Sequence, residues 1–211
     1  MKAKHQVHNL IILDESGSMN AIKHQVIRGF NEIVQTVKAV EQKYTDQEHF
    51  ISFVTFNGLG ITEHLFNVPV RNLQIIDENS YKPCATTPLY DAMGFSFSKL
   101  EKVLHDSINY NVLVTVFTDG EENASKEFSG MAIKEKIEEL KDKRWTFTYT
   151  GTDHDVHRAA RRLSIKNVVE FTSDEAKMKE MFENEIASRF IYSENIRSKK
   201  DTSENFYSNE F

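Results

Sequence analysis

The sequence is poor in cysteine and has no long apolar runs, and each scarcity excludes a class of protein. Cys84 is the only cysteine, so an intrachain disulfide and a zinc site built on several thiolates are both excluded. No stretch approaches the roughly 20 apolar residues that a membrane-spanning helix needs. The run from Leu10 to Leu13 ends at Asp14 and is too short for the apolar part of a signal peptide. We therefore expect a cytoplasmic protein without a membrane span.

Positive charge is also in short supply. Lysine and arginine number 26 against 32 aspartates and glutamates, a formal net charge of -6 at pH 7. No basic stripe is present that could neutralise the phosphates of a nucleic acid. The nearest approach to one, between Arg158 and Lys166, has the helical spacing that is typical of a solvated face. We therefore expect no nucleic-acid partner.

Two catalytic signatures are missing from the sequence. There is no G-x-S-x-G segment, which removes the usual signature of a serine hydrolase. There is no P-loop either, so an ATPase associated with this chain would have to be a separate protein.

The length of 211 residues with 39% hydrophobic content suits one domain with a sizeable core and is short for two. We assign residues 1–197 to this single domain. Residues 198–205 show no hydrophobic periodicity, which predicts a disordered polar tail over 198–211. Phe206, Tyr207 and Phe211 make this tail more adhesive than a purely solvating one.

Two continuous apolar runs each lead into an aspartate. The first covers residues 7–13 and ends at Asp14, and the second covers residues 112–118 and ends at Asp119. Such runs are typical of strands that are buried on both faces of a parallel sheet. We expect these two strands to be neighbours. Their aspartates would then share the carboxyl edge of the sheet, where ligands bind in open α/β folds.

The remaining pattern alternates amphipathic helices with strands. Asn20 is a plausible N-cap of the first helix, and Thr172 with Glu175 has capping-box spacing before the last. The glycine-bearing turn at residues 57–60 predicts a hairpin whose second strand carries Pro69 and lies at an edge. We expect an α/β fold, a doubly wound, mostly parallel sheet with one antiparallel edge strand and helices on both faces. The expected helices are 20–40, 89–104, 130–143, 153–163 and 175–190, and the further strands are 49–56, 61–70, 145–150 and 167–171.

Hydroxyl groups follow the first aspartate at the second and fourth positions, in the form D-x-S-x-S. These are Ser16 and Ser18, and magnesium and calcium prefer such hard oxygen ligands. Alone the segment is weak, because Asp, Ser and Gly are ordinary turn residues. Two further residues make it more specific, namely Thr87 directly before a predicted helix and Asp119 in Thr-Asp-Gly-Glu.

These three ordered motifs resemble the von Willebrand factor A domain family, whose metal-ion-dependent adhesion site has the same parts in the same order. The likeness covers roughly residues 7 to 195. It is strongest to stand-alone A domains of bacteria and phages, through the blocks Leu-Asp-Glu-Ser-Gly-Ser-Met, Thr-Pro-Leu-Tyr-Asp-Ala and Thr-Asp-Gly-Glu-Glu-Asn. The resemblance implies the doubly wound fold described above.

The resemblance also implies a ligand set. Ser16, Ser18 and Thr87 would touch a cation through their hydroxyls, and Asp14 and Asp119 would bind it directly or through water. Magnesium is the expected ion, with calcium or manganese as alternatives, because calcium would recruit more carboxylates. Such a site leaves the ion with an open position and little local neutralisation, which favours a carboxylate from a partner. We therefore expect a non-enzymatic module that binds an Asp or Glu of another protein.

Two other functions remain open. Haloacid-dehalogenase-like phosphatases also place an aspartate at the end of the first strand beside magnesium, but usually with a second acid two residues later. Here that position is Ser16, which cannot protonate a leaving group at neutral pH. The domain could instead be a docking subunit of a larger assembly with a separate ATPase, with the last helix and the aromatic tail as contact elements.

Several polar neighbours have two interpretations each. Thr86 is a second candidate ligand or a helix cap, and Glu15 and Met19 either shape the rim of the ion site or are ordinary loop and helix-start residues. Glu121 and Glu122 either orient waters or form an acidic helix-entry loop. The Asp153-His154-Asp155-Val156-His157 segment is either a transition-metal cluster or, as we favour, a polar N-cap segment.

Overall fold

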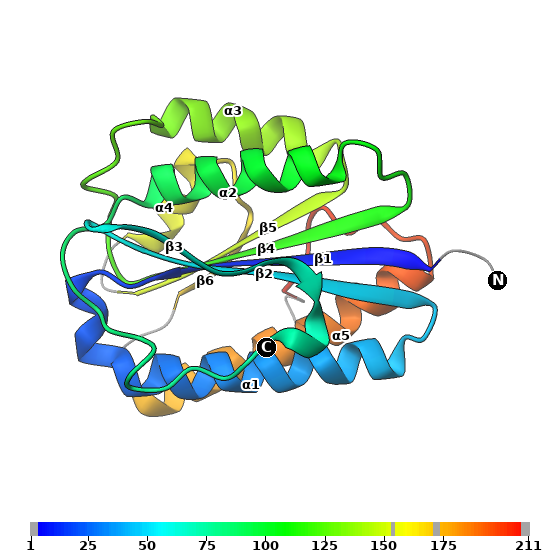
Figure 1. The fold of residues 1–211 in the computed structure, drawn as a ribbon, viewed down its shortest axis with the longest axis horizontal. Helices are drawn as coiled ribbons and strands as arrows, with labels where there is room; N and C mark the ends of the chain where they lie inside the picture. Colours follow the sequence, from blue (N-terminus) through cyan, green and yellow to red (C-terminus); the bar gives the residue numbers. More distant parts are fainter. Residues whose placement is uncertain (1–3, 153–154, 171–173, 208–211) are drawn as a thin grey trace.

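The computed structural model describes residues 4–152, 155–170 and 174–207, and its centre is one six-stranded sheet. The strands are β1 (His5–Asp14), β2 (Gln47–Asn57), β3 (Gly60–Pro69), β4 (Tyr110–Thr118), β5 (Trp145–Gly151) and β6 (Asn167–Glu170). They lie in the order β3-β2-β1-β4-β5-β6 (Figure 1). β3 runs antiparallel to β2, and every other neighbouring pair is parallel.

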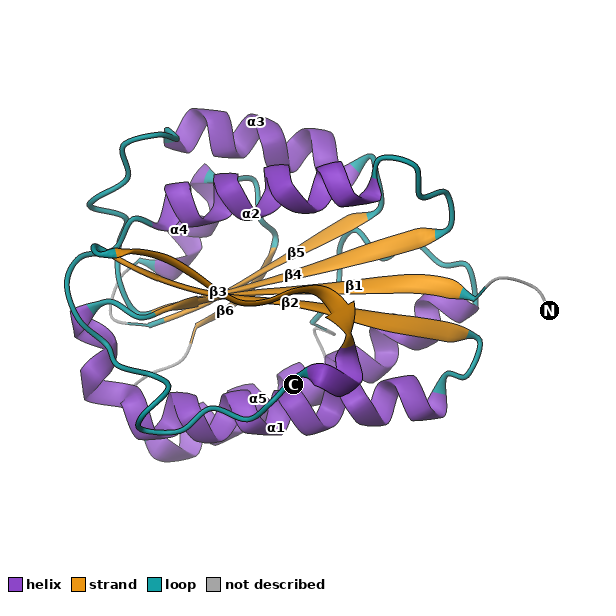
Figure 2. Ribbon diagram, viewed as in Figure 1, coloured by secondary structure: helices purple, strands orange, loops and turns teal. Residues whose placement is uncertain are grey.

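Helices cover both faces of the sheet (Figure 2). One face carries α2 (Leu89–Leu104), α3 (Gly130–Lys141) and α4 (Val156–Arg162), and the other carries α1 (Lys23–Lys43) and α5 (Glu175–Arg197). Two short 3-10 helices, η1 (Gly17–Ile22) and η2 (Val70–Asn72), complete the set. The doubly wound, mostly parallel α/β fold predicted from the sequence is confirmed.

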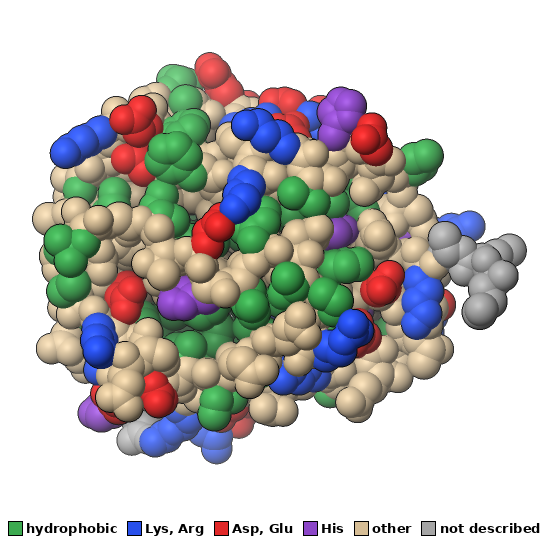
Figure 3. Space-filling view, viewed as in Figure 1, with side chains coloured by type: hydrophobic (Ala, Val, Ile, Leu, Met, Phe, Trp, Pro, Cys, Tyr) green, Lys and Arg blue, Asp and Glu red, His purple; other side chains and the backbone are tan. Residues whose placement is uncertain are grey.

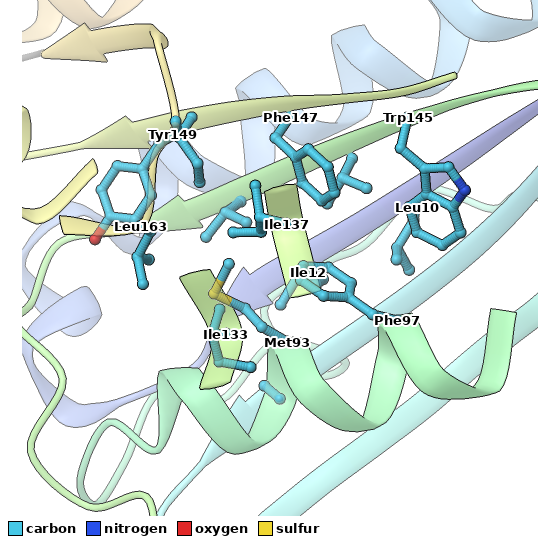
Figure 4. Close-up of a cluster of buried hydrophobic side chains, with 14 of the residues drawn as sticks. Leu10, Ile12, Met93, Phe97, Ile133, Ile137, Trp145, Phe147, Tyr149 and Leu163 are labelled. Carbon is cyan, nitrogen blue, oxygen red and sulfur yellow. The ribbon is translucent and has the colours of Figure 1, made fainter. Parts of the chain in front are cut away.

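The sheet has a hydrophobic core on each face because successive side chains of a strand point to opposite sides. On β1, Leu10 and Ile12 belong to the core under α2 and α3, whereas Ile11 and Leu13 belong to the core over α1 and α5. Figure 4 shows the first of these cores, in which Phe97 of α2 meets the aromatic side chains of β5. Burial on both faces explains why β1 has the apolar run from Leu10 to Leu13 and why most of β4 is apolar.

The edge hairpin also follows the prediction. β2 and β3 pair antiparallel and Pro69 is the last residue of β3, at the outer edge of the sheet. Gly60 has φ of +148°, a backbone conformation that L side chains rarely adopt, so the turn requires glycine there. The predicted adjacency of the first and fourth strands is confirmed by the parallel pairing of β1 with β4.

Two predicted helix starts need correction. Asn20 does not cap α1, because it lies inside η1, and α1 begins only at Lys23. The loop with the serines continues as a tight 3-10 turn before the α-helix forms. Asp174 caps α5 by accepting hydrogen bonds from the backbone N–H groups of Ala176 and Lys177, whereas Thr172 lies outside the described residues.

The prediction of a disordered tail from residue 198 is wrong for residues 198–207. Phe206 and Tyr207 are buried and pack with Tyr192 of α5 in a third hydrophobic cluster. Thr202 accepts a hydrogen bond from Asn111 through its hydroxyl and another from Thr146 through its carbonyl, at 2.9 and 2.6 Å. These partners lie far away in sequence, so local periodicity could not reveal them. Residues 208–211 are outside the described part of the chain.

The surface matches the charge balance of the sequence. Lysines, arginines, aspartates and glutamates are interspersed over the face shown in Figure 3, with no area of a single sign covering it. Within the described residues, every helix is too short or too polar to cross a membrane.

Candidate metal centre

The predicted site residues gather at the carboxyl edge of the sheet, where β1 and β4 lie side by side. Asp14 is the last residue of β1, and Asp119 directly follows β4. From β1 the chain continues to β2 on one side, whereas β4 lies on the other side. Such a point of divergence opens a crevice between the loops that follow the strands, and it is the usual ligand position in open α/β sheets.

Asp14 is fully buried, and both of its carboxylate oxygens are held. Oδ1 accepts a hydrogen bond from the backbone N–H of Ser16 at 2.7 Å, and Oδ2 accepts one from the hydroxyl of Thr118 at 2.6 Å. Burial and, to a smaller extent, the nearby charge of Asp119 raise the pKa of Asp14 to about 6, against the lowering effect of these hydrogen bonds. A cation beside this carboxylate would stabilise its ionised form.

The two serines form a row that ends on the second aspartate. The hydroxyl oxygens of Ser16 and Ser18 are 3.2 Å apart, and Ser18 donates to Oδ1 of Asp119 at 2.7 Å. Ser16 is buried whereas Ser18 is exposed, so the row runs from the interior to the surface. The turn of η1 places both hydroxyls on the same side of the chain.

Thr87 joins this group from a different loop. It is buried, its N–H donates to Oδ1 of Asn123 at 2.9 Å, and its carbonyl accepts from the N–H of Asn123 at 3.2 Å. A Cβ placed on Gly120 would lie 3.5 Å from Oγ1 of Thr87 and 3.6 Å from Oγ of Ser18. The hydroxyls of Thr87 and Ser18 therefore face the same small space beside Asp119.

Thr86 does not share this position. A Cβ on Gly58 would come within 2.3 Å of its hydroxyl oxygen, so the Thr86 side chain lies against the β2–β3 turn. It does not cap α2 either: the N–H groups of Tyr90 and Asp91 donate to Glu122 and Ser125 at 2.9 and 3.0 Å. Of the two interpretations of Glu122, orienting waters or forming an acidic helix-entry loop, these contacts support the helix-entry loop.

Sequence reasoning missed the residues that hold the site together. Tyr81, in a stretch that shows no periodicity, is buried and donates to the main-chain carbonyl of Asp14 at 2.6 Å. Asp91 accepts from the three N–H groups of residues 126–128, each at 2.9 Å. The only sequence signal for this network is the abundance of Asp, Asn and Ser around α2. The hydrogen-bond partners of Tyr81 and Asp91 lie more than 30 positions away in the chain, so no local pattern connects them.

The other neighbours take ordinary structural roles. Met19 is fully buried in the core over α1. Oε1 of Glu15 accepts from the N–H of Lys82 at 2.6 Å, which ties the segment after Tyr81 to the η1 loop. Asp155 caps α4, in line with a polar N-cap segment, whereas Asp153 and His154 lie outside the described residues.

The donor set suits a hard cation better than zinc. Two carboxylates and three hydroxyls converge from three loops, and oxygen-only sets are typical of magnesium and calcium. In the part of the chain that the structure describes, no three or more His, Cys, Asp or Glu side chains are grouped to hold a metal. Any cation at this edge would therefore depend on the hydroxyls of Ser16, Ser18 and Thr87.

The fold recurs in solved structures of low sequence identity. A von Willebrand factor type A protein from Catenulispora acidiphila matches with a TM-score of 0.53 and 16% identity, over 89% of this chain and 43% of that one. Proximal thread matrix protein 1 from the mussel byssus matches in two structures with TM-scores of 0.55 and 0.54 and 13% identity, over 87% of this chain and 46% of that one. The chain thus spans less than half of these proteins, and such identities show the fold alone.

The sequence itself gives the family. The profile of the von Willebrand factor type A domain matches residues 10–184, a span that contains both aspartates, both serines and Thr87. The match covers most of the chain and agrees with the sheet order and with the position of the site. The chain belongs to the von Willebrand factor type A domain family.

Proposed function

We propose that this chain is a binding module that takes up a divalent cation, with magnesium preferred, and through it captures an acidic side chain of another protein. Protein interaction is the general role of the family, which supports the first half of this proposal. The observation that carries the second half is the convergence of the Ser16, Ser18 and Thr87 hydroxyls between the carboxylates of Asp14 and Asp119.

Ser18 and Asp14 would have different roles at a bound cation. Ser18 directs its hydrogen at Asp119, so its lone pairs are available to a cation. Asp14 already accepts hydrogen bonds on both oxygens, which suits it to balance charge at longer range. A bound cation would supply a positive charge with an open coordination position, and neutral hydroxyl ligands would leave that charge for a partner's carboxylate.

An exposed apolar side chain lies on a turn that packs against the loops of the proposed site. Leu59, at the tip of the β2–β3 turn, is 83% exposed. Its turn is tied to the metal loops, because Asn57 contacts Sγ of Cys84 at 3.5 Å and Gly58 lies against Thr86. A protein bound at the cation could cover this side chain, and burial of its apolar surface would then add to the affinity. We propose that the partner offers an apolar group beside its acidic residue.

We propose no catalytic role for this edge. The position two residues after Asp14, where a phosphatase of the haloacid-dehalogenase type usually has its acid, is Ser16, and its hydroxyl faces Ser18. The docking-subunit alternative loses one of its candidate elements, because the aromatic residues Phe206 and Tyr207 are buried against the sheet.

The test is calorimetric titration of the purified chain with magnesium, followed by affinity capture of partners with magnesium or with chelator. Asp119→Ala should abolish both cation uptake and capture. Asp106→Ala is the matched control, because its side chain is 99% exposed and it follows α2, away from the site. Unchanged magnesium binding in Asp119→Ala would refute the cation site, and capture that persists in chelator would refute its role in binding.

A further inference from the structure

A second concave site lies at the opposite end of the sheet from the carboxyl edge. Here the amino ends of β1 and β4, the α1–β2 turn and the segment after α5 surround a cavity of about 1150 Å³, which we call the amino-edge cavity. The elements that line it meet, in Figure 1, at the end where the chain enters β1 and where the segment after α5 returns to the sheet. It shares no residue with the proposed cation site.

The lining of this cavity is strongly basic in a chain whose net charge is -6. Among the described residues that line it, the acids are Asp46 and Asp201. Asp46 pairs with Arg197 at 2.7 Å, and the carboxylate of Asp201 accepts from the N–H of Ser203 at 2.9 Å. The basic side chains are Lys4, Lys141, Arg144, Arg197, Lys199 and Lys200.

Most of the basic side chains that line the cavity have no ion-pair partner within residues 4–152, 155–170 and 174–207. Among the residues that the structure describes, Lys4, Arg144, Lys199 and Lys200 form no ion pair. Like charges around one cavity repel each other, and this cost falls when an anion occupies the space between them. A ligand with several negative charges would relieve this repulsion most and would therefore bind most tightly.

Part of the wall is fixed before any ligand arrives. The guanidinium of Arg144 donates to the carbonyl of Ile108 at 2.9 Å and lies over the ring of Tyr110, 5.8 Å from its centre. The ring nitrogens of His5 lie 2.8 and 2.9 Å from the side-chain oxygens of Asn109 and Asn111. Groups that are already ordered lose little conformational entropy on binding, and a guanidinium matches phosphate oxygens in a planar fork.

We propose that the amino-edge cavity binds a small anion that carries several phosphate groups. The cavity is large enough for a chain of three phosphates, and guanidinium and ammonium groups line it from separate elements. The ligand would be either a free polyphosphate or the phosphate chain of a nucleotide. It would bridge the segment after α5 to the strand ends.

The experiment is calorimetric titration of the full chain with sodium tripolyphosphate in chelator-containing buffer, which removes divalent cations from both partners. We expect saturable binding with one site per chain. The double variant Lys199→Gln with Lys200→Gln should weaken binding about tenfold, given the modest worth of each exposed charge pair. The matched control, Lys126→Gln with Lys177→Gln, removes the same charge from exposed positions elsewhere and should change the affinity less than twofold.

The possible outcomes separate this proposal from the cation site and identify the source of the phosphates. Adenosine triphosphate that binds like tripolyphosphate, with no binding of adenosine, supports recognition of the phosphate chain alone, whereas tighter binding of the nucleotide assigns the ligand to that class. Asp119→Ala should bind tripolyphosphate normally. Absence of saturable binding, an equal loss in the control pair, or a loss in Asp119→Ala would each overturn the proposal. A second variant, Lys4→Gln, repeats the test on another element if the first pair unfolds.

Discussion

The adjacent residues Thr86 and Thr87 differ in the position of their hydroxyls: only the hydroxyl of Thr87 faces the proposed site. The hydroxyl of Thr87 faces Ser18 beside Gly120, whereas that of Thr86 lies against Gly58 in the β2–β3 turn. The backbone of Thr87 is held by Asn123 on both its N–H and its carbonyl. Its side chain can therefore change while the loop stays in place.

Thr87→Val should lower the affinity for magnesium by at least about tenfold, because it removes one oxygen ligand from the proposed site and keeps the branched shape. Calorimetric titration with magnesium measures the effect. The matched control is Thr86→Val, which removes the adjacent hydroxyl and should leave cation affinity unchanged. An equal loss in both variants would mean that the loop, and not the Thr87 hydroxyl, determines affinity.

Two buried histidines make stability depend on pH. Burial lowers the pKa of His8 to about 4 and that of His49 to about 3, against a usual value of 6.5. His8 is stacked on Phe50, and its Nδ1 lies 2.9 Å from Oδ1 of Asn67. Between these pKa values and 6.5, the unfolded chain binds more protons than the folded one, so stability falls as pH falls.

We predict that the free energy of unfolding decreases between about pH 6.5 and pH 4, and that His8→Phe reduces this slope. Each unit of pKa difference corresponds to about 1.4 kcal/mol. Asp14 acts in the opposite direction in this range, because its raised pKa stabilises the folded state as pH falls. Urea unfolding of the unmodified chain and of His8→Phe at pH 7 and pH 5 measures how far the stability of each falls. The difference between the two decreases is the contribution of His8. Parallel slopes would show that His8 does not titrate on unfolding.

At the scale of elements, the segment after α5 completes the third hydrophobic cluster, which lies between α5 and the sheet. Phe206 packs edge-on against Tyr192 and Tyr207, and its N–H donates to the side chain of Asn167 at 2.9 Å. The hydroxyl of Tyr207 donates to Glu185 at 2.7 Å, in the interior. This segment therefore joins α5 to β6 and, through Thr202, to the beginnings of β4 and β5.

Phe206→Ala should lower the free energy of unfolding by about 3 to 5 kcal/mol, because it leaves a cavity between α5 and the sheet. Phe95→Ala provides the same chemical change at a site that is 48% exposed and should cost about 1 kcal/mol or less. Urea unfolding of the two variants measures the difference. A small effect at Phe206 would mean that the segment after α5 contributes little to the stability of the domain.

The elements also show what the sequence can and cannot reveal. β1 and β4 were predictable because burial on both faces favours apolar residues at successive positions, and α3 was predictable from the spacing of Ile133, Ile137 and Leu140. The five proposed ligands were found through the spacing of the family's motifs. Tyr81 was not, because its only signal is a contact with Asp14, 67 positions away in the chain. Partners at such separations leave no local pattern.

At the scale of the whole molecule, the fold brings two regions of opposite character to the two ends of one sheet. Hydroxyls and carboxylates gather at the carboxyl ends of β1 and β4, and lysines and arginines line the amino-edge cavity. Parallel strands make this separation possible, because they direct all their following loops to one edge and all their preceding loops to the other.

Collecting two carboxylates at one edge should carry a stability cost that the proposed cation reverses. Asp14 and Asp119 repel each other, and the repulsion contributes to the raised pKa of Asp14. Asp119→Asn removes this repulsion and keeps an oxygen that can accept from Ser18, so in chelator it should be at least as stable as the unmodified chain.

In magnesium at 100 times its dissociation constant, the unmodified chain should gain about 2.7 kcal/mol, because only the folded state binds the ion. The variant should gain far less, so that the order of the two melting temperatures inverts between chelator and magnesium. Equal gains in both proteins would show that Asp119 takes no part in cation binding, and a variant that is less stable in chelator would show that its charge serves the fold.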